Sequence, residues 1–184
     1  EKNIISSTGA LSLEKVPKSM IVIGGGYIGL EMGSVWSRLG SKVTVLEYLD
    51  HITPGMDREI SNEFKKILSK QGIEFKLNSK VLSVKKSGTN INVIYEDILS
   101  KAKKEIISEK VLISVGRKPF TSGLHLDKAG VKTDLKGRVE VNTKLQTNVK
   151  NIFAIGDVIK GPMLAHKAEE EGIAVAEILA GQAG

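Results

Sequence analysis

The stretch that decides the fold is Met20-Ile-Val-Ile-Gly-Gly-Gly-Tyr-Ile-Gly-Leu-Glu31. It opens with the apolar run Met20–Ile23, which has the length and composition of a buried parallel strand. Three glycines follow at the spacing G-x-G-x-x-G, at Gly24, Gly26 and Gly29, and a helical pattern begins without a break. A glycine turn between a strand and a helix is the context in which this motif predicts dinucleotide binding.

Each glycine of the turn has a separate physical role in that prediction. Gly24 permits the tight turn, Gly26 removes a side chain where the backbone meets a pyrophosphate, and Gly29 lets the helix pack closely on the strand. The start of the helix supplies amide N–H groups and a partial positive charge for the phosphates. A tight β–α turn that binds no ligand has the same spacing, so the motif by itself leaves both interpretations open.

Glu47 ends the second predicted strand, residues 42–47, which a crossover helix places parallel to the first. It lies 18 residues after Gly29, close to the separation of about 20 residues expected for an acidic residue that binds the adenosine ribose. A carboxylate there can accept hydrogen bonds from both ribose hydroxyls and would repel a 2′-phosphate. Because the next residue is Tyr48 rather than arginine, the sequence favours NAD over NADP.

The next part of the chain predicts an α/β fold, a Rossmann-like parallel sheet with an antiparallel β-meander. A helix is expected from Asp57 to about Gln71, with its apolar face packed against the sheet. That face carries Ile60, Phe64, Ile67 and Leu68. Strand patterns follow at residues 73–77, 80–86, 91–95, 105–107 and 110–115. The first and last of these are expected in the parallel sheet, and the others form a hairpin with a third antiparallel strand.

The predicted domain boundaries lie where the composition changes. Residues 1–19 form a leading segment, in which Pro17 ends any regular element before the first strand. Residues 20–117 form the dinucleotide-binding domain, and residues 118–184 form part of a second α/β domain. This last part has three predicted elements, strands at residues 137–141 and 151–155 and a helix at residues 164–180.

Composition excludes several function classes. The 184 residues contain no cysteine, so the chain has no disulfide, thiolate nucleophile or thiolate metal site, and no metal site is predicted. The net charge is +6, but the lysines are scattered and aromatic residues make up 4%, so we expect no nucleic-acid partner. No apolar run approaches the roughly 20 residues that span a bilayer, so we expect no membrane association. The chain does not begin with methionine, and we expect it to be part of a longer protein.

A second candidate site follows the predicted strand at residues 151–155. That strand delivers Asp157 at its carboxyl end, the edge at which open α/β sheets bind ligands. The carboxylate can accept hydrogen bonds from sugar-alcohol hydroxyls, and the amides of residues 163–166 open a helix and can donate to a ring edge. A Gly-Asp turn without a ligand is the alternative interpretation.

Six motifs in chain order resemble the dihydrolipoamide dehydrogenase family, the FAD- and NAD-dependent branch of the pyridine nucleotide–disulfide oxidoreductases. They lie at residues 24–31, 33–40, 54–57, 116–120, 152–158 and 163–168. Together they cover nearly the whole chain and are far more specific than the glycine motif alone.

The resemblance implies roles for residues of the first domain in NAD binding. The pyrophosphate turn corresponds to Gly24, Gly25, Gly26, Tyr27, Ile28, Gly29, Leu30 and Glu31. Glu47 would hold the adenine ribose, Val81 would pack beside the adenine, and Gly116 would lie near the nicotinamide half. Tyr27 resembles an aromatic gate over the flavin, and Glu31 would lie near the flavin–nicotinamide junction.

For FAD, the resemblance implies that Asp157 binds the ribityl or diphosphate part. The residues implied to line the flavin are Met163, Leu164, Ala165 and His166. His166 would act through its backbone and not as a catalytic base.

Parts of the family pattern are absent from these residues. The first glycine motif, the redox-active cysteine pair and the His–Glu acid/base pair of the interface domain are not here, so no catalytic residue is expected in this chain. The resemblance implies a homodimeric parent enzyme that serves the lipoyl domains of 2-oxoacid dehydrogenase complexes, in the mitochondrial matrix of a eukaryote or the cytoplasm of a bacterium. Alternatives are another flavin disulfide reductase, an NADH oxidase and a non-catalytic NAD-binding module.

Overall fold

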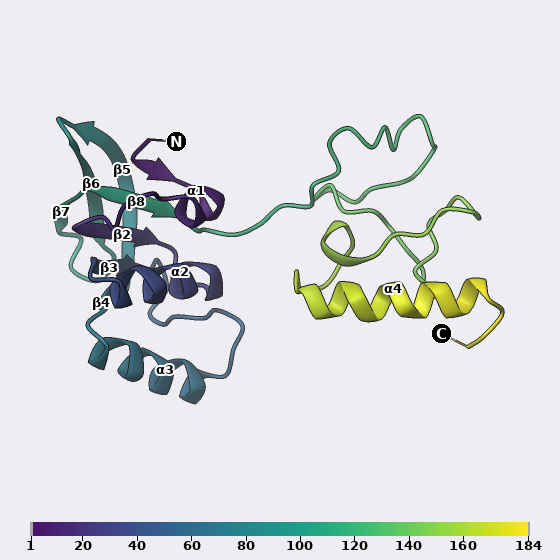
Figure 1. The fold of residues 1–184 in the computed structure, drawn as a ribbon, viewed down its shortest axis with the longest axis horizontal. Coiled ribbons are helices and arrows are strands. Elements are labelled where there is room, and N and C mark those ends of the chain that lie inside the picture. Colours follow the sequence, from purple (N-terminus) through teal and green to yellow (C-terminus); the bar gives the residue numbers. More distant parts are fainter. Residues whose placement is uncertain (1, 184) are drawn as a thin grey trace. The chain divides into compact units, whose positions relative to one another are not determined.

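The computed structural model describes residues 2–183, and the chain divides into two compact units. The first unit ends at Gly116 and the second begins at Arg117 (Figure 1).

The first unit is built on a five-stranded parallel sheet in the order β1-β8-β2-β3-β4. Its strands in chain order are β1 Ile4–Ile5, β2 Ser19–Ile23, β3 Lys42–Leu46, β4 Glu74–Lys76 and β8 Lys110–Ile113. The second sheet of this unit is an antiparallel meander of β5 Ser79–Ser87, β6 Asn90–Asp97 and β7 Lys103–Ser108. The predicted fold class, a Rossmann-like parallel sheet with an antiparallel meander, is confirmed.

Strand β2 has no polar side because both of its faces are covered. Met20 and Val22 belong to a core that also contains residues of the helices, whereas Ile21 and Ile23 belong to a second core shared with the meander. All four are at most 7% exposed. A strand covered on both faces is apolar at its buried positions, which is why residues 20–23 form a continuous apolar run.

Two longer helices follow β2 and β3. Helix α2, Tyr27–Arg38, contacts both strands and buries Leu30 and Trp36. Helix α3, Arg58–Lys70, begins after Asp57, whose carboxylate accepts the amide hydrogens of the first turn. Each helix lies between two successive parallel strands in the sequence and so forms the crossover connection that a parallel pair requires.

The leading segment contains two elements that we did not predict. Strand β1 pairs with β8, with Ile4 opposite Val111, and helix α1, Ser7–Leu11, is capped by the Ser6 hydroxyl. Ile5 is buried in the first core, so this segment forms one edge of the sheet. A two-residue strand has no readable periodicity, and its partner lies more than 100 positions away in the sequence.

The predicted burial of the apolar face of α3 is confirmed for Leu68 and wrong for Ile60, Phe64 and Ile67. The residues of α3 that are buried are Ser61 and Leu68, whereas Ile60, Phe64 and Ile67 are 56%, 37% and 52% exposed. Residues 61 and 68 lie two turns apart on one face, and Ile60, Phe64 and Ile67 lie on the neighbouring one. The face that carries Ser61 can be buried although this residue is polar, because its hydroxyl is hydrogen-bonded to the hydroxyl of Thr53 in the preceding loop.

The second unit consists mainly of turns around a small core of Val131, Val139 and Ile159. Its helices are the short 3-10 helix η1, Gly156–Val158, and α4, Ala165–Leu179. The predicted strands at residues 137–141 and 151–155 are wrong among the residues described here. Each segment instead makes one isolated antiparallel bridge, Thr133–Val139 and Gln146–Phe153, because tight turns separate the paired residues.

Within residues 2–183, no helix is both long enough and apolar enough to cross a lipid bilayer.

Candidate functional site

The glycine turn between β2 and α2 is closed on its inner side and open on its outer side. A Cβ on Gly24 would lie 2.5 Å from the Ser114 carbonyl oxygen, and φ at Gly24 is +107°. A Cβ on Gly29 would lie 2.4 Å from the Gly24 carbonyl oxygen and 3.0 Å from Val22 Cγ1. A Cβ on Gly26 would meet no described atom within 4 Å, so the first turn of α2 begins beside open space.

The backbone groups of Gly24 and Gly25 are bound from three directions. The Gly24 N–H donates to the Leu46 carbonyl at the end of β3, at 2.9 Å. The Ser114 hydroxyl lies 3.0 Å from the Ile23 carbonyl oxygen and 3.2 Å from the Gly24 carbonyl oxygen, and it can donate its hydrogen to either. The Gly25 carbonyl accepts the Thr53 N–H at 2.8 Å. The amides of the first turn of α2, in contrast, have no acceptor within an α-helix and are the groups that can bind a phosphate.

Glu47 lies against the turn and is 7% exposed. Its Oε2 accepts the Gly25 N–H at 2.5 Å, and its Oε1 accepts the Leu49 N–H at 2.8 Å. A carboxylate has about four lone-pair sites, so these bonds leave capacity for further donors such as hydroxyl groups. The residue that spacing predicted therefore touches the glycine turn directly, through side-chain geometry that spacing could not predict.

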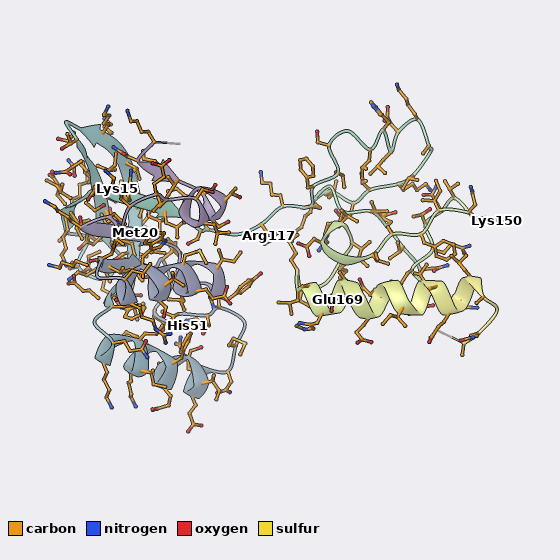
Figure 2. The ribbon with its side chains drawn as sticks, viewed as in Figure 1. Lys15, Met20, His51, Arg117, Lys150 and Glu169 are labelled. Carbon is orange, nitrogen blue, oxygen red and sulfur yellow. The ribbon has the colours of Figure 1, made fainter. Side chains whose placement is uncertain are left out.

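The loop at residues 48–56 runs from Glu47 to α3 and is fixed at several points. Ile52 is fully buried in the first core, and Arg58 makes a two-pronged contact with Asp50. This contact holds the pKa of Asp50 well below its ordinary value, and a hydrogen bond from His51 (Figure 2) acts in the same direction. The Thr53 hydroxyl lies 2.8 Å from the Ser61 hydroxyl.

The other predicted residues of the first unit differ in exposure. Tyr27 is 48% exposed on the first turn of α2, Ile28 is half-buried and Glu31 is exposed. Leu30 is 1% exposed and belongs to the core, so that it could meet a ligand through its backbone and not its side chain.

Val81 and Gly116 lie in different parts of the first unit. Val81 is on β5, where it packs partly buried against the core shared with the meander. The Ser79 N–H two residues earlier donates to the Glu47 carbonyl at 2.8 Å, so β5 starts beside the predicted ribose site. Gly116 follows β8 and is exposed, with φ +128°.

Five predicted site residues belong to the second unit. Asp157 lies in η1, and its Oδ2 is 2.8 Å from Nη2 of Arg117, the first residue of this unit (Figure 2). The neighbouring Gly156 N–H donates to Glu171 Oε2 of α4 at 2.7 Å, and Glu171 also pairs with Lys167. The Glu171 carboxylate of α4 therefore holds η1 to this helix.

The flavin-lining candidates lie at the start of α4. Leu164 is the residue that precedes the helix, and its extended backbone has no side-chain capping bond. Met163 and Leu164 are half-buried, whereas Ala165 and His166 are exposed. Their amides lie where a helix begins, and such amides can donate to an electron-rich group.

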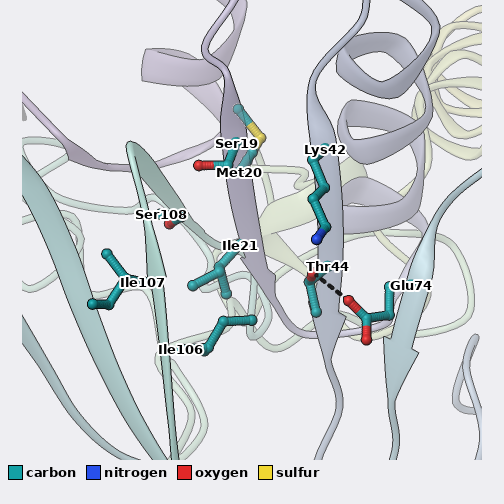
Figure 3. Close-up of a pocket in the computed structure, with 9 residues that line it drawn as sticks. All are labelled: Ser19, Met20, Ile21, Lys42, Thr44, Glu74, Ile106, Ile107 and Ser108. Atoms are coloured by element: carbon teal, nitrogen blue, oxygen red, sulfur yellow. Dashed lines mark hydrogen bonds between the residues drawn. The ribbon is translucent and has the colours of Figure 1, made fainter.

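A small cavity of about 90 Å³ lies at the amino ends of the parallel strands, away from the glycine turn at their carboxyl ends (Figure 3). Its lining includes Ser19, Lys42 and Glu74, the first residues of β2, β3 and β4, and Thr44 donates to Glu74 across it. Pockets for drug-sized ligands and cofactors measure about 300–1,000 Å³, so this cavity is too small for a dinucleotide. Among residues 2–183, no group of three or more His, Asp or Glu side chains is arranged to hold a metal ion.

Sequence reasoning missed three residues that contact the candidate sites, namely Ser114, Thr53 and Arg117, and it missed Ser61, which contacts Thr53. Arg117 lies within a motif that we had used for the resemblance, but its ion pair spans 40 positions. The others carry no sequence signal, because a serine or threonine near a turn is common and its partner is decided by the fold.

The sequence matches the family described as "Pyridine nucleotide-disulphide oxidoreductase" over residues 1–172. The chain belongs to the pyridine nucleotide–disulphide oxidoreductase family. This agrees with the resemblance that the motifs indicated.

Curated relatives of the family are similar along the whole chain. A mitochondrial dihydrolipoyl dehydrogenase of Pisum sativum is 55% identical over all 184 residues, which are 37% of the pea protein. A leghemoglobin reductase of Glycine max is 54% identical, and the chain covers 35% of it. The mitochondrial dihydrolipoyl dehydrogenase of Sus scrofa is 53% identical, with 36% covered. The chain thus spans a little over a third of the length of these relatives.

A solved structure has the same fold. A HOCl-induced flavoprotein disulfide reductase from Escherichia coli superposes with a TM-score of 0.88 at 32% identity, over 97% of this chain and 40% of that protein. This flavoprotein disulfide reductase therefore has the same arrangement of helices and strands at 32% sequence identity.

Proposed function

We propose that the first unit is the NAD-binding domain of an FAD-dependent dihydrolipoyl dehydrogenase. In this proposal the second unit is part of the central domain that contacts FAD. The observation that carries the proposal is the contact between Glu47 and the glycine turn, with Oε2 2.5 Å from the Gly25 nitrogen. It brings a ribose acceptor and a phosphate turn together at the carboxyl edge of a parallel sheet.

The residues present fit a dinucleotide. Gly26 leaves open space at the start of α2, where a phosphate would receive the helix amides and the favourable end of the helix dipole. The Glu47 carboxylate would accept the ribose hydroxyls of NAD, and its negative charge would repel the 2′-phosphate of NADP. Val81 would pack beside the adenine, and Gly116 would lie along the nicotinamide half.

For FAD, we infer that Asp157 accepts a hydroxyl of the ribityl chain or a neighbouring group. Arg117 holds one oxygen of this carboxylate and leaves Oδ1 to accept such a hydroxyl. The start of α4, from Met163 to His166, would line the flavin. When bound, the two cofactors would supply the redox chemistry by which electrons from dihydrolipoyl thiols reach NAD. This chain has no cysteine, and we expect no lipoamide turnover from the 184 residues alone.

The parent protein would serve the lipoyl domains of 2-oxoacid dehydrogenase complexes as a homodimer. The mitochondrial relatives support the mitochondrial matrix as its location if the source is a eukaryote, and the bacterial cytoplasm is the corresponding location otherwise. A second candidate is a flavoprotein disulfide reductase with another electron partner. It is favoured by the soybean relative, which is 54% identical but is named for leghemoglobin.

Calorimetric titration of the 184-residue chain with NAD and NADP tests the cofactor. NAD should bind, and NADP should bind at least about tenfold more weakly because Glu47 opposes its extra charge, a difference of about 1.4 kcal/mol. Glu47→Ala should weaken NAD binding by about 1–3 kcal/mol, the cost of unpaired hydrogen-bonding groups.

The matched control is Glu14→Ala, which removes an exposed carboxylate from the same unit. It should leave the NAD affinity unchanged. Circular dichroism melting of each variant shows whether it is folded during the titration. Equal affinity for the two dinucleotides, or an unchanged NAD affinity in Glu47→Ala, would refute the proposal.

A further inference from the structure

Thr53 has a backbone conformation that a β-branched residue rarely adopts. Its φ is +49°, in the left-handed region. Such conformations persist where surrounding contacts hold them, and they cluster at functional sites. Thr53 lies in the loop at residues 48–56, which we call the clamp loop.

The contacts that hold Thr53 lead to the glycine turn on one side and to α3 on the other. Its N–H donates to the Gly25 carbonyl at 2.8 Å, and its hydroxyl lies 2.8 Å from the Ser61 hydroxyl. Ile52, the residue before it, is fully buried, so that the loop cannot shift without disturbing the core.

Ser61 is unusual for its position. It is 1% exposed on the buried face of α3, where an apolar residue would ordinarily pack, and alanine would favour the helix more. Its hydroxyl is paired with Thr53. Leaving a buried hydroxyl unpaired costs free energy, so burial of Ser61 favours keeping the Thr53 hydroxyl within hydrogen-bonding distance.

We propose that Thr53 and Ser61 are positioning residues that hold the glycine turn in its phosphate-binding shape. The chain of contacts runs from Ser61 through Thr53 to the Gly25 carbonyl, and Gly25 directly precedes Gly26, where a phosphate would approach. Binding groups must be held within about 0.5 Å of their productive geometry, and residues behind them supply that precision. This inference rests on the proposed NAD-binding function, because it concerns the shape of the turn that would bind the phosphates. Neither side chain is assigned a contact with the cofactor itself.

Amide hydrogen exchange on the cofactor-free chain tests whether Ser61 and Thr53 hold the glycine turn. Ser61→Ala and Thr53→Val each remove one hydroxyl, and valine keeps the shape and branching of threonine. In both variants the Thr53 and Gly25 amides should exchange at least about fivefold faster, whereas the Val22 amide in the centre of β2 should not change. Thr53→Ser keeps the hydroxyl and should behave like the wild-type chain.

Titration with NAD gives the functional readout. Ser61→Ala and Thr53→Val should each raise the Kd for NAD about 3- to 10-fold, the range expected for one lost hydrogen bond. The matched control is Ser69→Ala, which makes the same change on an exposed position of α3 and should alter neither measurement.

The two readouts separate the possible failures. If the wild-type chain binds no NAD, the proposed function fails. The exchange pattern still decides whether Ser61 and Thr53 hold the glycine turn. Unchanged exchange at Thr53 and Gly25 in both hydroxyl-deleting variants would overturn the inference. Equal acceleration at Val22 would also overturn it, because these residues would then stabilise the whole unit rather than the turn.

Discussion

Replacing glycine with alanine at two positions of the turn should affect different properties. The change at Gly29 should lower stability, and the change at Gly26 should weaken NAD binding. At Gly29 the new Cβ would lie 2.4 Å from the Gly24 carbonyl oxygen and 2.5 Å from Ser114 Oγ. At Gly26 it would meet no described atom within 4 Å. The first position is inside the protein, and the second is where a phosphate would approach.

The magnitudes follow from these distances. Gly29→Ala gains about 1 kcal/mol of helix propensity, but overpacking against a backbone oxygen and a short side chain costs about 3 kcal/mol, at the upper end of the usual range. The net loss of about 2 kcal/mol should lower Tm by about 8 °C for a unit of this size. Gly26→Ala places a residue that caps helices poorly at the N-cap, but it reduces the freedom of the unfolded chain, so its stability should change by less than about 0.5 kcal/mol.

Thermal melting and NAD titration of both variants test the two roles. Gly26→Ala should melt like the wild-type chain and bind NAD at least about tenfold more weakly, which is about 1.4 kcal/mol. An unchanged Tm in Gly29→Ala would contradict the packing argument. An unchanged NAD affinity in Gly26→Ala would show that the phosphates do not approach this part of the turn.

The remaining predictions concern stability. The pKa of Asp50 is lowered in the folded state mainly by its hydrogen bonds with Arg58, so the stability that it contributes is present above its ordinary pKa of about 4 and is lost as the pH falls through the lower folded value. Thermal melts should therefore show that Asp50→Asn lowers Tm at pH 7, with a difference that disappears in strong acid; a difference that grows in acid would contradict this. Gly156→Ala should destabilise the second unit by about 1–3 kcal/mol in urea titrations, because φ is +69° and a Cβ would lie 2.9 Å from that of Ala168. Trp36→Ala should cost about 3–5 kcal/mol, because this side chain is 8% exposed in the core, and circular dichroism in urea would reveal a smaller effect if the packing argument fails.

Much of the first unit could be predicted because its signals are local. Three patterns depend only on neighbouring positions: the apolar run of β2, the glycine spacing, and the alternation of apolar and polar residues at 80–86 and 91–95. The predicted elements are present at each of these places. The orientation of α3 could not be predicted in this way. Its apolar periodicity indicated a buried stripe, but the face that the fold buries carries Ser61, whose hydroxyl is paired with Thr53 in a loop outside the helix.

The second unit was harder to predict because a strand requires a partner as well as a pattern. The apolar runs at residues 137–141 and 151–155 have strand composition, yet each forms one isolated bridge among the described residues. Strand propensity reports a fit to a half-buried pleated surface, and here the apolar side chains fill a small core between turns instead.

The sequence by itself determined the strand, turn and helix around Gly24–Gly29 and the distance along the chain to Glu47, because both depend on local periodicity and spacing. The tertiary structure alone decided that the Glu47 carboxylate binds the Gly25 amide, and that Ser114 and Thr53 hold the neighbouring carbonyls. Those bonds join residues that are 22 to 90 positions apart. Their geometry depends on how the sheet brings the carboxyl ends of separate strands to one edge, which no local pattern records.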